Sequence, residues 1–160
     1  MTVTSGTAEP AIRRAEPVDA DAIAKLLDAF SREFDEPTPG PEVLAERVRQ
    51  LLTADEITVL LAGTEPHGLA VLRFRPALWT DALDCYVEEL YVGPERRGQG
   101  LGRALMEAVI EHARRRGAAH IDLGTGEDDL AARSLYESLG FDNRGGRRDG
   151  TVNYFYEREL

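Results

Sequence analysis

Thiol and imidazole side chains are scarce in this sequence. It contains one cysteine, Cys85, and three scattered histidines, at positions 67, 112 and 120. A single cysteine excludes an intramolecular disulfide and a thiolate metal cluster, and the histidines do not have the spacing of metal ligands. We therefore expect no metal cofactor. Cys85 is expected to pack as a small hydrophobic residue of a strand.

Long apolar runs are absent as well. Residues 57–62 form one of the longest, and none approaches the roughly 18 apolar residues that a membrane-spanning helix needs. The first ten residues have neither a basic start nor an apolar stretch, so no signal or transit peptide is recognisable. We expect a cytoplasmic protein with no membrane partner, in which residues 1–10 are disordered and residues 11–160 form a single domain.

Positive charge is in short supply. The chain has 19 lysines and arginines against 29 acids, a formal net charge of −10, which argues against a nucleic-acid partner because phosphate contacts need a basic face. Residues 94–116 are the exception, with six arginines and three glutamates. This local excess predicts a bound anion. Residues 114–116 can equally stabilise a helix C-terminus, but that does not explain Arg96, Arg97 and Arg103.

Hydrophobic periodicity divides the chain into alternating strands and helices. Strands are expected at residues 11–15, 57–62, 69–74, 85–92, 121–123, 141–144 and 152–158, and helices at 18–34, 43–52, 101–116 and 130–139. Gly117 and Gly140 are expected to end the last two helices. This order predicts an α/β (α+β) fold with a mixed central sheet of about six to seven strands and helices on both faces.

The most informative segment runs from a predicted strand through a glycine-rich turn into a helix, over residues 90–103 (LYVGPERRGQGLGR). Such a turn exposes backbone N–H groups at the positive end of a helix dipole. Glycines allow the backbone to approach a ligand closely. The natural ligand is a phosphate or diphosphate, to which Arg97 and Arg103 can add charge-assisted hydrogen bonds. A purely structural turn is the alternative, and the spacing matches neither the dinucleotide-binding nor the P-loop motif.

Two segments carry a resemblance to a known family. Residues 97–102 (RGQGLG) resemble the R/Q-x-x-G-x-G/A acyl-CoA signature of the GNAT family of N-acetyltransferases. Residues 129–141 (DLAARSLYESLGF) resemble the family's N-x-x-A-x-x-L-Y-x-x-x-G-F segment, with Asp129 where asparagine is common. The resemblance implies a GNAT-like acyl-CoA N-acyltransferase fold and an acetyl-CoA-dependent N-acetyltransferase.

The resemblance also implies where acetyl-CoA binds. Its pantetheine arm would pair with the strand before the turn, and its diphosphate would lie on the amides that follow. A backbone N–H of Leu90 or Tyr91 could stabilise the oxyanion of the reaction. The residues expected to bind the cofactor are Leu90, Tyr91, Val92, Arg97, Gly98, Gln99, Gly100, Leu101, Gly102 and Arg103.

Acetyl transfer to an amine needs a base for the amine and an acid for the departing thiolate. Tyr136 matches the family tyrosine that can protonate the sulfur, although a core tyrosine is the alternative. The candidate bases are Glu88 and Glu89, and strand alternation is expected to direct only one of them toward the cleft. The resemblance favours Glu88, acting directly or through water. A solvated strand glutamate is the alternative, and some family members have no dedicated base.

The acceptor is the least determined part of the prediction. Acids gather at residues 81–89, which favours a small cationic amine such as a polyamine, an aminoglycoside or a lysine-like amine. The residues expected to contact it are Trp79, Asp81 and Glu88. Ordinary solvated loops are the alternative for this acidic group.

Two further questions stay open at the level of the sequence. A non-catalytic acyl-CoA-binding regulatory module is the rival to an enzyme, since it would keep the glycine turn but need neither acid nor base. Many relatives pair as dimers, so a homodimer is one expected assembly.

Overall fold

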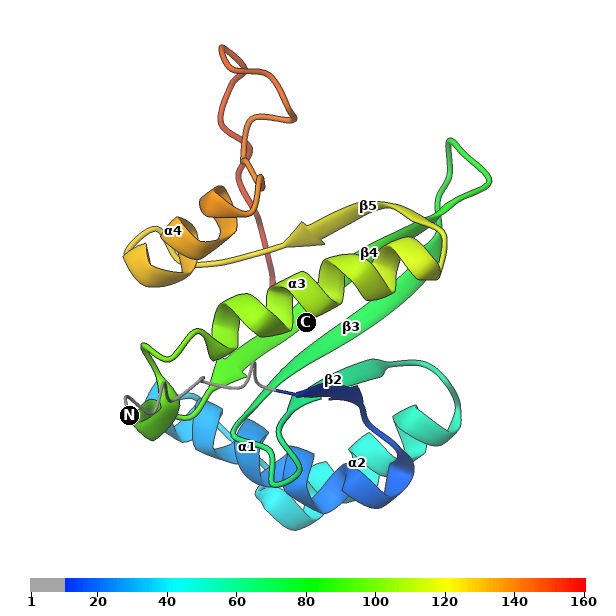
Figure 1. The fold of residues 1–160 in the computed structure, drawn as a ribbon, viewed down its shortest axis with the longest axis vertical. Coiled ribbons are helices and arrows are strands. Elements are labelled where there is room, and N and C mark those ends of the chain that lie inside the picture. Colours follow the sequence, from blue (N-terminus) through cyan, green and yellow to red (C-terminus); the bar gives the residue numbers. More distant parts are fainter. Residues whose placement is uncertain (1–10) are drawn as a thin grey trace, which may run out of the picture. The chain divides into compact units, whose positions relative to one another are not determined.

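The computed structural model describes residues 11–160, so the predicted disorder of residues 1–10 lies outside the described residues. The chain divides into two compact units, Met1–Asp122 and Leu123–Leu160 (Figure 1). That all of residues 11–160 form one domain stays a prediction. Between residues 11 and 160, no helix has the length and apolar character needed to cross a membrane.

The elements follow an α/β order along the chain. They are β1 (Ile12–Arg14), η1 (Pro17–Asp19), α1 (Ala20–Glu33), α2 (Pro41–Thr53), β2 (Thr58–Ala62), β3 (Gly68–Pro76), β4 (Leu83–Val92), η2 (Pro94–Arg96), α3 (Leu101–Arg115), β5 (Ala118–Leu123) and α4 (Leu130–Ser138). The strands form one sheet in the order β1-β2-β3-β4-β5. β1 to β4 are antiparallel neighbours, whereas β5 runs in the same direction as β4 after the α3 crossover, so the sheet is mixed (Figure 1).

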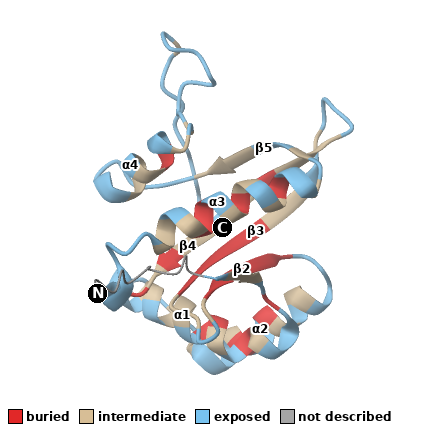
Figure 2. Ribbon diagram, viewed as in Figure 1, coloured by how far each residue is buried: buried red, intermediate tan, exposed pale blue. Residues whose placement is uncertain are grey.

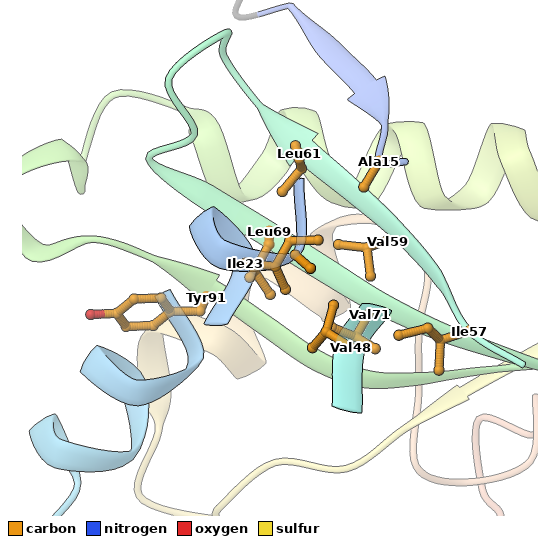
Figure 3. Packing of buried hydrophobic residues seen from close by; sticks show 10 residues of the cluster. Ala15, Ile23, Val48, Ile57, Val59, Leu61, Leu69, Val71 and Tyr91 are labelled. Atoms are coloured by element: carbon orange, nitrogen blue, oxygen red, sulfur yellow. The ribbon is translucent and has the colours of Figure 1, made fainter. Parts of the chain in front are cut away.

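Helices cover both faces of the sheet, as expected. On one face, alternate residues of β2 and β3 pack against α1 and α2 (Figure 3); the cluster includes Ile23, Val48, Val59, Leu61 and Val71. Each such side chain contributes about 1.5–3 kcal/mol when fully buried. α3 covers the other face, and β2 and β3 are therefore buried on both sides over much of their length (Figure 2).

The helix boundaries agree with the sequence signals. α2 begins at Pro41, which is tolerated in a first turn because its missing N–H would have no helical partner. Gly117 and Gly140 follow the last residues of α3 and α4 with φ of 81° and 89°. Only glycine adopts such values readily, so the predicted helix ends are confirmed.

The predicted final strand pair is wrong, and the sheet has five strands rather than six to seven. Residues 139–160 contain no strand. The carboxylate of Asp142 accepts the N–H groups of Arg144 and Gly146, at 2.6 and 3.0 Å from its Oδ1. One backbone hydrogen bond, from Asn153 N–H to the Asn143 carbonyl at 2.7 Å, joins the two halves of this segment. Strand propensity does not make a strand without a ladder of backbone hydrogen bonds to a neighbour.

Candidate active site

The glycine-rich turn lies between β4 and α3, as the sequence predicts. Gly98 and Gly100 have φ of 72° and 81°, in the left-handed region that favours glycine. No atom lies within 4 Å of where a Cβ would stand on either residue. Residues 94–100 are exposed. The turn is thus open on its outer side and available to a ligand.

The first turn of α3 begins with backbone N–H groups that have no acceptor within the helix. Gly100 is the N-cap residue and no side chain caps the helix. The first intrahelical bond runs from Ala104 N–H to the Gly100 carbonyl at 3.0 Å. The N–H groups of Leu101 and Gly102 precede it and have no helical acceptor. Together with the helix dipole, they form an environment suited to an anion.

Arg97 is held by the protein itself, which the sequence did not predict. Its two terminal nitrogens lie 2.6 and 2.8 Å from the carboxylate oxygens of Glu33, at the C-terminal end of α1. Its Nε donates to the Val92 carbonyl at 3.0 Å. The hydrogen bonds from Arg97 lower the pKa of Glu33, so this glutamate is ionised at neutral pH. Arg97 therefore fixes the start of the turn by fastening it to α1 and to the end of β4.

Tyr91 belongs to the same arrangement. Its hydroxyl donates to Glu33 Oε2 at 3.0 Å. Its ring stacks on Phe30, with centroids 4.9 Å apart, and lies next to α1 (Figure 3). The Arg97 guanidinium carbon is 5.7 Å from the Tyr91 ring centroid. We call Glu33, Tyr91 and Arg97 the Glu33 cluster; it connects α1, β4 and the glycine turn.

Substitution of Glu33 by glutamine should weaken acetyl-CoA binding more than it slows turnover. The variant loses the negative charge that holds Arg97. We therefore expect KM for acetyl-CoA to rise about tenfold, with little change in kcat. Steady-state kinetics measure both constants. Asp28→Asn is the matched control, because Asp28 pairs with Arg32 on the same helix at 2.7 Å and does not contact the turn. A lower KM in Glu33→Gln would contradict the anchoring role, since it would mean that Glu33 competes with the cofactor for Arg97.

A β-bulge changes the direction of the two candidate bases. Val71 of β3 pairs with Glu89 and Leu72 pairs with Val87, so Glu88 is the extra residue on β4. Glu88 and Glu89 both line a cavity of about 340 Å³. The bulge interrupts the strand alternation, so both glutamates reach this cavity; which of them faces the acceptor stays a prediction.

The two glutamates have different environments. The Glu88 carboxylate is held by Arg73, with 2.6 Å between Arg73 Nε and Glu88 Oε2. Glu89 has no such partner among residues 11–160. Burial, and secondly the charge of Glu88, raise the pKa of Glu89 to about 7. A carboxyl with this pKa is partly ionised at neutral pH and can accept and release a proton there. Of the two predicted bases, Glu89 has the environment better suited to that role.

The cavity beside Glu88 and Glu89 lies over the α1/α2 face of the sheet and belongs to one compact unit. Most of its wall is apolar, with Leu27 and Phe30 from α1 and Leu44 and Leu51 from α2. Arg47 and Arg73 also line it. A second cavity, of about 420 Å³, lies along β3 and is lined by Arg73, Phe74, Arg75, Tyr86 and the acids at 55 and 56.

Two predicted acceptor residues lie apart from these cavities. Trp79 and Asp81 are in the loop between β3 and β4, and Trp79 is 91% exposed. Neither lines either cavity. Asp84, which contributes to the acidic group in the sequence, lies 3.7 Å from Arg75. The contact of Trp79 and Asp81 with an acceptor stays a prediction.

Tyr136 lies on α4, in the unit formed by Leu123–Leu160. Its side chain is buried and its ring makes an edge contact with Phe141, with centroids 6.1 Å apart. Burial, and then the charge of Asp129, raise the pKa of Tyr136 to about 12. The phenol therefore keeps its proton at neutral pH. Asp129 itself accepts the Ala132 N–H at 3.1 Å and caps α4, a role in which aspartate replaces asparagine well.

Groups that would indicate other chemistries are not assembled in residues 11–160. No group of three or more histidine, cysteine, aspartate or glutamate residues in this part of the chain could hold a metal ion. Cys85 is buried in β4, and burial raises the pKa of its thiol to about 11. A thiol this weakly acidic is a poor nucleophile at neutral pH.

Sequence reasoning missed two residues that contribute to the site, Glu33 and Arg47, whereas Arg73 could be proposed from the sequence as a residue that shapes the pocket. Glu33 lies three positions after Phe30, so it continues the apolar stripe of α1. A charged residue at such a position was the signal in the sequence that could have indicated a role for Glu33. Arg47 resembles an ordinary surface arginine of a helix, and only the structure shows that it lines the cavity.

Comparison with known proteins assigns this architecture to a family. The model of the acetyltransferase (GNAT) family matches residues 21–141. A crystal structure from Arthrobacter sp. FB24, of a protein assigned as an acetyltransferase, is 43% identical, with a TM-score of 0.86, and the match covers 98% of this chain and 99% of that one. The chain belongs to the GNAT acetyltransferase family, and it is accordingly an acyltransferase.

Two curated relatives illustrate the range of the family. An aminoglycoside N(6′)-acetyltransferase from Stenotrophomonas maltophilia is 30% identical over 139 residues, which are 83% of this chain and 86% of the relative. A mycothiol acetyltransferase from Thermobispora bispora is 42% identical over 81 residues, but that match spans 25% of its length. The chain thus spans a small part of some relatives and most of others, and the names of these two relatives differ in the acceptor.

Proposed function

We propose that this protein transfers the acetyl group of acetyl-CoA to a primary amine of a small molecule, by direct attack in a ternary complex. The observation that carries the proposal is the combination of a half-buried carboxyl, Glu89 of β4, with the open glycine turn that follows the end of β4 at Val92. Family membership supports the use of acetyl-CoA.

The cofactor would lie along β4 and the turn. Its diphosphate would accept hydrogen bonds from the amides of Gly98 to Arg103. Along a strand, successive residues direct their N–H groups to opposite edges, so one of Leu90 and Tyr91 directs its N–H away from β3. That donor is the candidate for binding the thioester oxygen as it becomes an oxyanion. Glu33 occupies the terminal nitrogens of Arg97. Arg97 would therefore stabilise the conformation of the turn rather than bind the diphosphate directly.

The reaction requires two proton transfers around one bond exchange. The amine nitrogen attacks the thioester carbon, and Glu89 accepts an amine proton directly or through one water molecule. The C–N bond forms and the oxyanion then collapses, breaking the C–S bond. Tyr136 donates its phenolic proton to the departing sulfur and is reprotonated from solvent. Its high pKa keeps the proton available, and positioned acid–base groups of this kind typically contribute 10²–10⁴-fold, an order-of-magnitude range.

A non-catalytic acyl-CoA-binding module would need only the glycine turn. It would not need a carboxyl whose pKa is raised to about 7 beside an apolar cavity of about 340 Å³. One measurement distinguishes the enzyme from the binding module: the release of CoA in the presence of a panel of primary amines. Binding of acetyl-CoA without turnover on any amine would support the regulatory module.

Replacement of Tyr136 by phenylalanine should lower kcat by about 10- to 100-fold and leave the affinity for acetyl-CoA unchanged, because the variant removes only the proton donor for the leaving sulfur. The release of free CoA thiol measures the rate, and calorimetry measures binding. Tyr154→Phe is the matched control, since Tyr154 is an exposed tyrosine of the same unit. An unchanged kcat in Tyr136→Phe would remove the tyrosine from the mechanism and leave it as a core residue.

A further inference from the structure

The cavity beside Glu89 has the size and lining of a small-molecule site. Its volume of about 340 Å³ is at the lower end of the 300–1,000 Å³ that is typical of such sites, as an order of magnitude. Its wall includes Ile23, Leu27, Phe30, Leu51, Val59 and Val71. An acceptor that fills this volume must therefore have an apolar body.

The charged residues of the cavity wall come from three different elements. β4 supplies Glu88 and Glu89, β3 supplies Arg73, and α2 supplies Arg47. The Glu88 carboxylate and the Arg73 guanidinium are 2.6 Å apart and neutralise each other. Two groups remain available to a ligand, namely Glu89 on the sheet and Arg47 on the helix. Within the described part of the chain, no hydrogen bond or ion pair joins Arg47 to another residue.

We propose that the acceptor is an amphipathic amino acid-like molecule, with a primary amine at one end, an apolar body, and an anionic group such as a carboxylate at the other end, and that Arg47 binds this anionic group. The inference rests on the proposed function, because Glu89 marks the amine end only if it acts on the amine. Arg47 would donate charge-assisted hydrogen bonds to the anion, for which a planar guanidinium is well suited.

This charge pattern disfavours a polycationic acceptor. Two of the four acids that the sequence shows at residues 81–89 are compensated in the structure, with Asp84 beside Arg75 and Glu88 beside Arg73. A second ammonium group of a diamine would meet the positive charge of Arg47 on the wall of the cavity. Like charges brought together in a partly apolar site are unfavourable.

The test is a set of primary amines of matched chain length that differ only at the far end. Each length includes an ω-amino acid, the parent alkylamine and the corresponding α,ω-diamine. We expect kcat/KM to be highest for the ω-amino acid, lower for the alkylamine and lowest for the diamine. Acetyl-CoA is present at saturation, and CoA release gives the rate.

Arg47→Gln should lower kcat/KM for the preferred ω-amino acid by about tenfold, which is the usual effect of losing one exposed charged contact. The value for the alkylamine should not change, and the diamine should improve. Arg49→Gln is the matched control, because Arg49 is on the same helix, pairs with Glu46 at 2.8 Å and does not line the cavity. It should leave all three amines unaffected.

The outcomes separate this inference from the proposed function. Turnover that favours the diamine, or that falls equally for all three amines in Arg47→Gln, overturns the acceptor class while the acetyltransferase reaction stands. Absence of turnover on every amine, with acetyl-CoA still bound, overturns the proposed function and this inference with it.

Discussion

Substitution of Gly100 by alanine should reduce the affinity for acetyl-CoA by about 100-fold, or roughly 2.7 kcal/mol. Gly100 has φ of 81° and opens α3 at the point where the diphosphate is proposed to bind. An alanine strains the backbone at this φ, by about 1–2 kcal/mol, and places a Cβ on the outer side of the turn. Both effects act on the amides that follow. Calorimetry with acetyl-CoA measures the change directly.

The control for this substitution lies at the other end of the same helix. Gly117 also has φ of 81° and also has no atom within 4 Å of a Cβ position. Gly100→Ala and Gly117→Ala should therefore lower the melting temperature by similar amounts. Gly117→Ala should leave the affinity for acetyl-CoA intact. Equal losses of affinity in the two variants would show that backbone strain alone, and not the place of Gly100 in the turn, explains the effect.

Replacement of Glu89 by glutamine should lower kcat by about 10²–10³-fold, because an isosteric amide cannot accept the amine proton. Since the pKa of Glu89 is about 7, the wild-type rate should rise with pH up to about that value as the carboxyl loses its proton. The variant should lack this limb of the profile. Rates measured from about pH 5.5 to 9 test both statements.

Stability gives a second readout that separates loss of chemistry from loss of fold. Burial raises the folded pKa of Glu89 above its unfolded value of about 4.3. The unfolded chain thus releases this proton first, and folding stability contributed by Glu89 declines between about pH 4.3 and 7. Glu89→Gln should be at least as stable as the wild type above pH 7. A melting temperature clearly below that of the wild type would contradict the desolvated position assigned to Glu89.

Glu88→Gln is the comparison that decides between the two candidate bases. The substitution weakens the pair with Arg73 but leaves Glu89 in place. We expect a smaller loss of kcat and a pH profile that keeps its limb but shifts it to lower pH, because the charge of Glu88 no longer raises the pKa of Glu89. A larger loss in Glu88→Gln than in Glu89→Gln would return the role of base to Glu88, as the resemblance alone suggested.

Local signals explain which parts of the fold were predictable. Pro41 at the start of α2, and the glycines that follow α3 and α4, act through backbone preferences that depend on a few neighbouring residues. The glycine turn was predictable for the same reason. The strands at residues 141–144 and 152–158 were expected from their residue types, but a strand also requires a partner, and in this structure Asp142 holds the backbone in turns instead.

Contacts between distant segments account for what the sequence did not predict at the site. Glu33 and Arg97 are 64 positions apart, and only the packing of α1 beside β4 brings them together. The bulge at Glu88 depends on the register between β3 and β4. The role proposed for Arg47 follows only from its position on the wall of the cavity between α2 and the sheet. None of these relations appears in a local pattern of residues.

The central claim is that the backbone amides between Gly98 and Arg103 bind the diphosphate of coenzyme A. A titration of the ¹⁵N-labelled protein with CoA, in which the amide resonances are monitored, is the direct test. The account predicts saturable shifts that are largest at Gly98, Gly100 and Gly102, and much smaller shifts at Gly117. Saturable binding with the largest shifts outside the turn, or no binding at all, would contradict it.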